Sequence, residues 1–136
     1  MSSTGFRGRT SVKTTRRPWS SKFANAFRGL SRAFRTQSSF FIHVWAAVAV
    51  VVAGAVLRVS LVEWCLLAGA IGIVLVAETF NTALESLARA VDVGRHPRIR
   101  DALDMASAGV LLSAMTAAVI GAIVLGHRVG ALTGCW

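Results

Sequence analysis

Three long apolar runs restrict this 136-residue chain more than any other feature. They cover residues 40–57, 61–77 and 106–125, and Glu63 is the only charged residue in them. A helix that crosses the hydrocarbon core of a bilayer needs roughly 17 to 25 such residues. Only 15% of the chain is charged, whereas soluble domains carry about 25%. The runs therefore predict an all-α integral membrane protein, and they exclude an ordinary soluble domain and a disordered chain.

The predicted organisation is one membrane domain behind a basic tail. We expect the tail over residues 1–19 and the membrane domain over residues 20–136. Spanning helices are expected at about 40–57, 61–87 and 104–126, because the second run can continue as a helix past its apolar part. Two cysteines, Cys65 and Cys135, are too few for a disulfide-dense secreted fold. Both would lie toward the outer face, and whether they pair stays open.

The distribution of basic residues predicts the orientation. Nine Lys/Arg precede residue 40 and no acidic residue accompanies them. The first link between spans carries Arg58 alone, whereas the second carries Arg89, Arg95, Arg98 and Arg100. Because short cytoplasmic loops are enriched in Lys and Arg, the N terminus and the second link should be cytoplasmic. The tail could be an organellar transit peptide, but we favour a tail that binds anionic lipids, and not nucleic acid.

A separate amphipathic helix is expected at about residues 20–37. Its apolar residues recur at helical spacing on one stripe, while arginines lie off that stripe; the stripe comprises Phe23, Phe27, Leu30 and Phe34. Such a helix can lie in the membrane interface, with aromatic rings in the acyl boundary and arginines at the phosphates. The stripe can equally pack against the spanning bundle, and both interpretations stand.

Three polar residues near the end of the second span are the strongest functional signal. Glu78, Asn81 and Glu85 stand at i, i+3 and i+7, so they share one helix face. Carboxylates near the bilayer are costly and usually mark a transport path, a metal or a catalytic group. Oxygen ligands on one face suit Mg²⁺ with a phosphorylated substrate, and Asp104 could join the same cluster. The alternative is that Glu78 and Glu85 only pair with Arg89, Arg100 or an arginine of the N-terminal helix.

Other chemical signals are few. The sequence contains no Gly-rich phosphate loop, no Ser-His-Asp set and no zinc spacing. His43 lies in the first turns of a predicted span, where a histidine could ligate a haem or chlorophyll. Glu63 and Trp64 read as an interfacial anchor and its neighbour at the outer end.

The polar face belongs to a longer pattern that resembles a known family. The pattern consists of AETFNTALES over residues 77–86, ALDMASAGVLL over residues 102–112 and, earlier in the chain, AFRGLSRAF, FFIH and VEWCLL. It is similar to the small bacterial membrane lipid kinases, the diacylglycerol kinase and undecaprenol kinase family. This resemblance implies a homotrimer of three-helix protomers in the bacterial inner membrane, each with an N-terminal amphipathic surface helix. It also implies transfer of the γ-phosphate of Mg²⁺-ATP to the hydroxyl of diacylglycerol or undecaprenol.

The resemblance assigns roles by position. Glu78 matches the glutamate that takes the proton of the lipid hydroxyl, and Asn81 matches the asparagine beside it. Glu85 matches a metal-ligating glutamate, and Asp104 matches an aspartate at the nucleotide. Phosphoryl transfer depends mainly on positioning and charge neutralisation, and this set of groups suits that chemistry.

Three positions depart from the family pattern. Gln37 stands where the family has a second metal-ligating glutamate, and it offers only a neutral carbonyl oxygen. Phe41 replaces an arginine, and Leu103 replaces a lysine that faces the phosphates. Arg98 or Arg100 could supply the missing cation. The second hypothesis is therefore a catalytically impaired member, a pseudoenzyme that acts as a structural subunit of a larger membrane complex.

Overall fold

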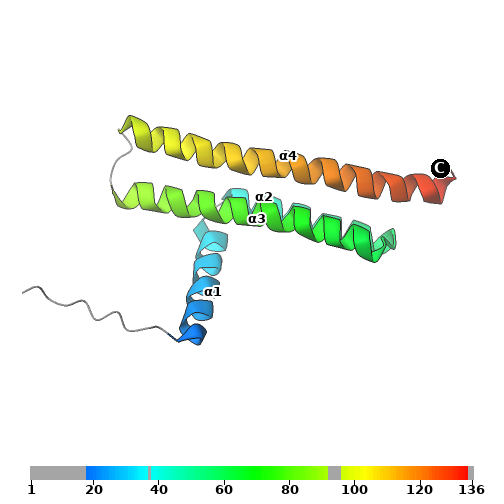
Figure 1. Cartoon of the computed structure of the whole chain (residues 1–136), viewed down its shortest axis with the longest axis horizontal. Helices are drawn as coiled ribbons and strands as arrows, with labels where there is room; N and C mark the ends of the chain where they lie inside the picture. Colours follow the sequence, from blue (N-terminus) through cyan, green and yellow to red (C-terminus); the bar gives the residue numbers. More distant parts are fainter. Residues whose placement is uncertain (1–17, 37, 92–95, 135–136) are drawn as a thin grey trace, which may run out of the picture.

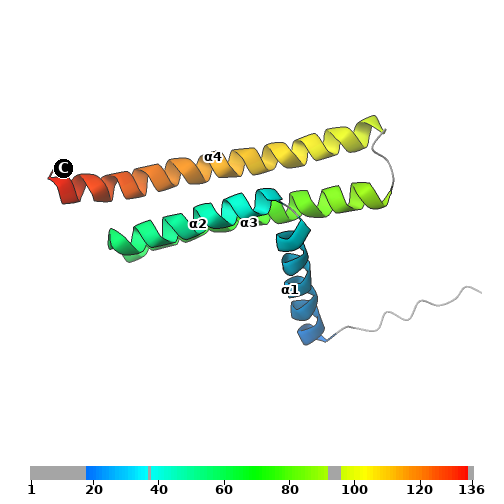
Figure 2. The same cartoon turned by 180° about the vertical axis from the view of Figure 1, so that it is seen from behind.

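Four helices form the part of the chain that the structure, a computed structural model, describes: residues 18–36, 38–91 and 96–134. They are α1 (Trp19–Thr36), α2 (Ser38–Val56), α3 (Leu61–Ala90) and α4 (Pro97–Thr133). Helices α2, α3 and α4 run side by side, and α1 stands across them (Figures 1 and 2). The predicted all-α fold is confirmed.

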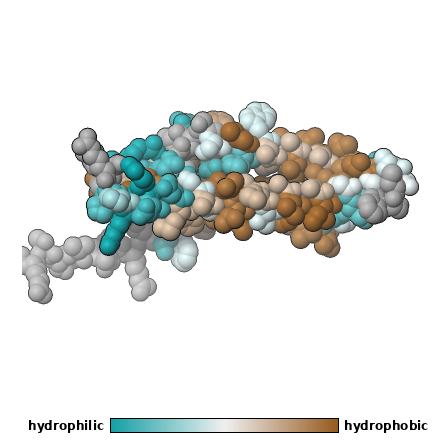
Figure 3. All heavy atoms as spheres, turned by 90° about the horizontal axis from the view of Figure 1, so that it is seen from above, coloured by the Kyte–Doolittle hydropathy of each residue, from teal (hydrophilic) through white to brown (hydrophobic). Residues whose placement is uncertain are grey.

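Helices α2, α3 and α4 are each long and apolar enough to cross a membrane, judged by length and composition. This finding agrees with the prediction of three helices of that length and composition. Apolar side chains cover much of the surface, while hydrophilic residues gather toward the end that holds the α3–α4 link (Figure 3). Val52, Val62 and Ile123 are among the large apolar residues that remain more than half exposed. Lipid is the environment in which such a surface is stable.

The three spanning helices differ in length. α2 has 19 residues, α3 has 30 and α4 has 37. At 1.5 Å per residue these are about 28, 45 and 55 Å, against a hydrocarbon core of about 30 Å. α2 is therefore only just long enough to cross, whereas α3 and α4 are longer than the core is thick. Figure 2 shows α3 running past the start of α2. The expected span at 104–126 is the apolar part of α4, which continues through polar residues at both ends.

Local sequence explains where the helices begin and end. Ser60 caps α3 in a capping box, because its hydroxyl accepts from the Glu63 backbone N–H while the Glu63 carboxylate accepts from the Ser60 N–H. Pro97 opens α4, where its missing N–H costs nothing. Gly134 follows α4 with a φ of 74°, a left-handed conformation that glycine adopts without strain.

The buried core lies toward the end of the bundle that holds the α2–α3 link. It is built from Val59, Leu67 and Val124. Gly54 of α2 is buried against the Trp64 ring, and a Cβ at this position would lie 3.0 Å from the ring atom Cη2. The absence of a side chain at residue 54 is therefore what lets the indole approach α2.

Helix α1 is attached to the bundle by aromatic packing. The rings of Phe34 and Phe40 meet edge to face with centroids 4.5 Å apart, and Phe40 is fully buried. Phe23 and Phe27, further from the bundle on the same predicted stripe, are 64% and 72% exposed. The stripe thus packs on the bundle at one end and is open at the other.

Candidate active site

The carboxylate of Glu78 is buried between helices. Its side chain is 2% exposed, and its Oε1 lies 2.9 Å from Nε2 of His43 on α2. Its other oxygen, Oε2, is buried and has no hydrogen-bond partner among the described residues. The sequence suggested an arginine partner for Glu78, but the structure places an imidazole there instead. A buried carboxylate is strongly disfavoured unless it is paired, so the histidine contact is central to this site.

Glu78 heads a short row of incompletely satisfied polar groups on α3. Within the described residues, Asn81 Oδ1 and Thr82 Oγ1 are also buried and without a hydrogen-bond partner. Residues at i, i+3 and i+4 share a helix face, so the three groups face the same region. By contrast, Thr79 satisfies its hydroxyl by donating to the Leu75 carbonyl oxygen at 2.7 Å. Buried unsatisfied atoms are rare in native proteins, and such a row indicates a place that a ligand or water completes.

Glu85 is held one turn further along α3. The Asn81 amide nitrogen Nδ2 donates to Glu85 Oε1 at 3.0 Å, and Arg89 contacts Oε2 at 3.4 Å. The Glu85 side chain is about one third exposed. The pairing of Glu85 with Arg89, one of the alternatives that the sequence left open, is present, so the carboxylate faces both the polar row and an arginine.

The lengths of the helices set the depth of these groups. His43 is the sixth residue of α2, so it lies about 7 Å inside the start of that helix. Glu78 is at the same level because the two side chains touch. α3 runs antiparallel to α2, and Glu85 lies about 10 Å further along it. If α2 spans the hydrocarbon core, Glu78 therefore lies just inside the membrane boundary and Glu85 lies at or beyond it.

The remaining predicted site residues lie at the start of α4 or near the start of α2. Arg98, Arg100 and Asp104 are exposed in the first turns of α4, and Leu103 is half-buried between them. Phe41 is 50% exposed on α2. Gln37 lies outside the described residues, so its predicted role as a metal ligand is untested.

The acidic groups do not form one cluster. Among residues 18–36, 38–91 and 96–134, no three His, Cys, Asp or Glu side chains lie close enough together to hold a metal ion. The expectation that Asp104 joins Glu78 and Glu85 in one cluster is therefore not met within the chain. Glu78 contacts His43 of α2, whereas Glu85, about 10 Å further along α3, contacts Asn81 and Arg89.

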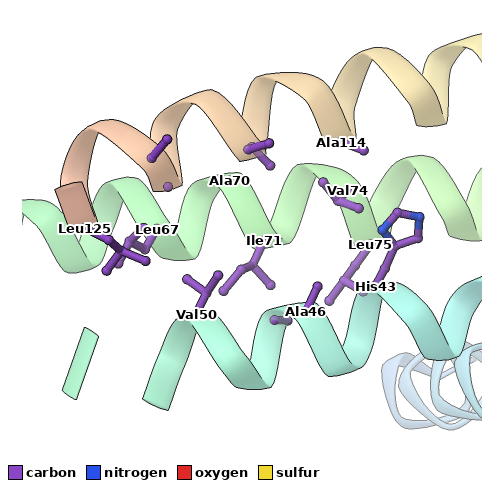
Figure 4. A pocket seen from close by; sticks show the side chains of 15 residues that line it. His43, Ala46, Val50, Leu67, Ala70, Ile71, Val74, Leu75, Ala114 and Leu125 are labelled. Atoms are coloured by element: carbon purple, nitrogen blue, oxygen red, sulfur yellow. The ribbon is translucent and has the colours of Figure 1, made fainter. Parts of the chain in front are cut away.

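A cavity of about 380 Å³ lies between α2, α3 and α4. Alanine, valine, leucine, isoleucine and glycine line it, and His43 is its one polar lining residue. Figure 4 shows His43 beside Leu75 at one end of the cavity and Leu67 and Leu125 at the other. The imidazole therefore lines this apolar cavity and also contacts the Glu78 carboxylate.

Sequence reasoning missed the ion pair at the opposite end of the bundle. Arg128 of α4 donates from Nε to both oxygens of Glu63, at 3.0 and 2.8 Å, and its Nη2 also contacts Oε2. The Ser60 hydroxyl donates to the same carboxylate at 2.7 Å. The sequence did carry half of this signal, because Ser60 and Glu63 have the spacing of a capping box.

Comparison with known proteins agrees with the resemblance noted in the sequence. The pattern that defines the family described as "Prokaryotic diacylglycerol kinase" matches residues 24–125. A Synechocystis sp. protein named diacylglycerol kinase is 37% identical over 105 residues, which are 76% of this chain but only 59% of that protein. A Bacillus subtilis protein named undecaprenol kinase is 31% identical over 102 residues, 75% of this chain and 83% of that protein. No solved structure matches significantly. The chain therefore belongs to the prokaryotic diacylglycerol kinase family.

Proposed function

We propose that this protein is a membrane lipid kinase that transfers the γ-phosphate of ATP to a lipid hydroxyl. The observation that carries the proposal is the buried Glu78 carboxylate, which has one oxygen held by His43 and the other without a partner among the described residues. Its relatives named diacylglycerol kinase and undecaprenol kinase support the same reaction class. The acceptor is diacylglycerol or undecaprenol.

Glu78 is the general base in this proposal. Its Oε2 accepts the proton of the lipid hydroxyl as the hydroxyl oxygen attacks the γ-phosphorus. The bond between that phosphorus and the bridging oxygen breaks, and ADP leaves. Glu78 suits this role because the acceptor hydroxyl of a lipid lies just inside the membrane boundary, the depth argued for Glu78 from the length of α2. Asn81 holds Glu85 with its Nδ2 and has its Oδ1 left for the reactants.

Glu85 and Gln37 are the proposed magnesium ligands. Mg²⁺ is usually bound by one or two carboxylates together with substrate phosphates, so a site without a full cage of protein ligands fits it. The buried Asn81 Oδ1, unpartnered among the described residues, is a further oxygen donor beside Glu85. When bound, the ion neutralises charge on the transferred phosphates. Glu85 and Asn81, which would hold the ion, lie on the α3 face that also carries Glu78.

Asp104, Arg98 and Arg100 are the proposed nucleotide contacts. The two arginines are exposed in the first turn of α4, where a helix N-terminus also favours anions. They replace the cation that Leu103 cannot supply. Arg98→Ala with Arg100→Ala should raise the KM for ATP, and an unchanged kinase rate would remove both residues from the site.

The proposed assembly is a homotrimer in the bacterial inner membrane with its N terminus in the cytoplasm. Helix α1 would lie in the interface as an amphipathic surface helix, with exposed Phe23 and Phe27 toward the acyl chains. The four arginines of the α3–α4 link region and the basic tail support a cytoplasmic location for the site end.

The test is a lipid-phosphorylation assay with the purified full-length protein. The protein is reconstituted and supplied with Mg²⁺-ATP and, in separate reactions, with diacylglycerol or undecaprenol. The radiolabelled lipid product is then measured. We expect product from the wild type and a loss of about 100-fold or more in Glu85→Gln, as for removal of a metal-bound group. No product above the Glu85→Gln level with either lipid would refute the kinase proposal.

The second candidate is a non-catalytic subunit that keeps the same scaffold. Leu103, half-buried, and Phe41, half-exposed, favour it because both stand where the family pattern carries cations. This candidate predicts no kinase product and copurification with other membrane proteins in fixed stoichiometry. Product formation by the isolated chain would exclude it.

A further inference from the structure

His43 makes the one hydrogen bond that the described structure gives to the Glu78 carboxylate. The two residues belong to different helices, and Nε2 of His43 lies 2.9 Å from Oε1 of Glu78. The His43 side chain is 22% exposed and that of Glu78 is 2% exposed. A hydrogen bond at such a depth is stronger than one in water, because little solvent competes for the partners.

The chemistry of the contact fixes the role of one ring nitrogen. A carboxylate only accepts, so Nε2 of His43 must carry a hydrogen and donate it to Oε1. With this nitrogen occupied, His43 cannot use it to ligate a haem or chlorophyll, which was the role open to it from the sequence. The imidazole ring also lines the apolar cavity, and none of the other residues that line this cavity has a polar side chain.

The contact also distinguishes the two oxygens of Glu78. A free carboxylate can turn and exchange Oε1 with Oε2, but a hydrogen bond from a second helix holds Oε1 against α2. Oε2 is then the oxygen left without a partner, on the same helix face as Asn81 Oδ1 and Thr82 Oγ1.

We propose that His43 is a positioning residue that holds Glu78 with Oε2 directed at the acceptor hydroxyl. This inference rests on the proposed kinase function. His43 donates to Oε1 throughout the reaction and does not touch the substrate. Its effect is on the orientation of the base, in the way that outer hydrogen-bond partners orient catalytic and metal-bound groups elsewhere.

The kinetic test compares His43→Leu with His43→Gln in the reconstituted full-length protein. Leucine fills similar space without a donor, whereas the glutamine amide can still donate to Oε1. We expect His43→Leu to lower kcat by about 10- to 100-fold, with the KM for ATP little changed, and His43→Gln to recover most of the loss. The matched control is His127→Leu, because His127 is exposed near the other end of the bundle and should leave kcat unchanged.

Three kinetic results would overturn the proposal. The first is wild-type kcat in His43→Leu, and the second is an equal loss in His43→Leu and His43→Gln, which would mean that the donor does not matter. An increase in the KM for ATP with unchanged kcat would assign His43 to nucleotide binding and would also overturn it.

A second measurement does not depend on activity. In ¹⁵N-labelled protein, Glu78→Gln should move the His43 ring nitrogen signals, and Glu85→Gln should leave them in place. Unmoved signals in Glu78→Gln would overturn the inference. If the wild-type protein phosphorylates no lipid, the proposed function fails, and this NMR experiment alone still decides whether His43 holds Glu78.

Discussion

The two ends of the helical bundle each hold a carboxylate that a second helix contacts, and the two carboxylates are satisfied very differently. At one end both oxygens of Glu63 accept from Arg128, and Ser60 adds further hydrogen bonds. At the other end only Oε1 of Glu78 is paired, with His43, and Oε2 has no partner among the described residues. Glu78 is nevertheless the more deeply buried of the two.

The difference matches a structural role for Glu63 and the catalytic role proposed for Glu78. A saturated pair such as Glu63–Arg128 joins α3 to α4 and has no free acceptor for a substrate. A buried carboxylate with a free oxygen costs stability, and such a cost is typical of sites that a ligand completes. The same residue type thus joins the helices at one end and leaves an oxygen atom without a partner at the other, among the described residues.

The same substitution at both ends of the bundle tests most directly whether Glu78 and Glu63 differ in role. Glu78→Gln keeps the shape of the side chain but removes the base, so lipid phosphorylation should fall by about 10²- to 10⁴-fold. The thermal stability of the Glu78→Gln variant should not fall, because the substitution replaces a buried, incompletely paired carboxylate with a neutral amide. Glu63→Gln is the matched control and should keep kcat near the wild-type value. Equal kinetic losses in the two variants would show that the ends do not differ in role.

A second prediction concerns the stability of the saturated end. Arg128→Met removes the cation that contacts both oxygens of Glu63, so the midpoint of thermal unfolding in detergent should fall by several degrees. Arg58→Met is the control, because Arg58 is exposed in the nearby α2–α3 link. If the two variants melt at the same temperature, the Glu63–Arg128 pair does not hold the helices together.

The smallest expected effect tests the close packing near the saturated end. A Cβ at Gly54 would meet the Trp64 ring at 3.0 Å, so Gly54→Ala should destabilise the fold by about 1 kcal/mol. Gly69→Ala serves as control because a Cβ there meets nothing within 4 Å, and alanine favours the helix. Reversible unfolding in mixed micelles measures both, and a Gly54→Ala variant at least as stable as Gly69→Ala would contradict the packing described.

Residue spacing predicted the features that depend on one helix. The apolar runs gave the three spans, and the four-residue spacing of Asn81 and Glu85 placed their side chains in contact. Residue spacing could not predict the contacts between helices. Glu63 and Arg128 are 65 residues apart, and His43 meets Glu78 only because α2 and α3 pack at one register. An intramembrane histidine and glutamate each need a partner, but spacing along one helix cannot say which.

The unequal helix lengths have a consequence for the two reactants. From Glu78, α3 continues for about 18 Å to Ala90. On the same side of the contact, only about 7 Å of α2 lies between His43 and the first residue of the helix. If α2 spans the hydrocarbon core, these ends of α3 and α4 extend beyond it, and they carry the exposed Arg89, Arg98 and Arg100. In the proposed reaction, a water-soluble phosphate donor can bind there without entering the lipid, and an apolar acceptor can stay within the lipid. The difference in helix length would therefore let the two proposed substrates meet at the polar row of α3.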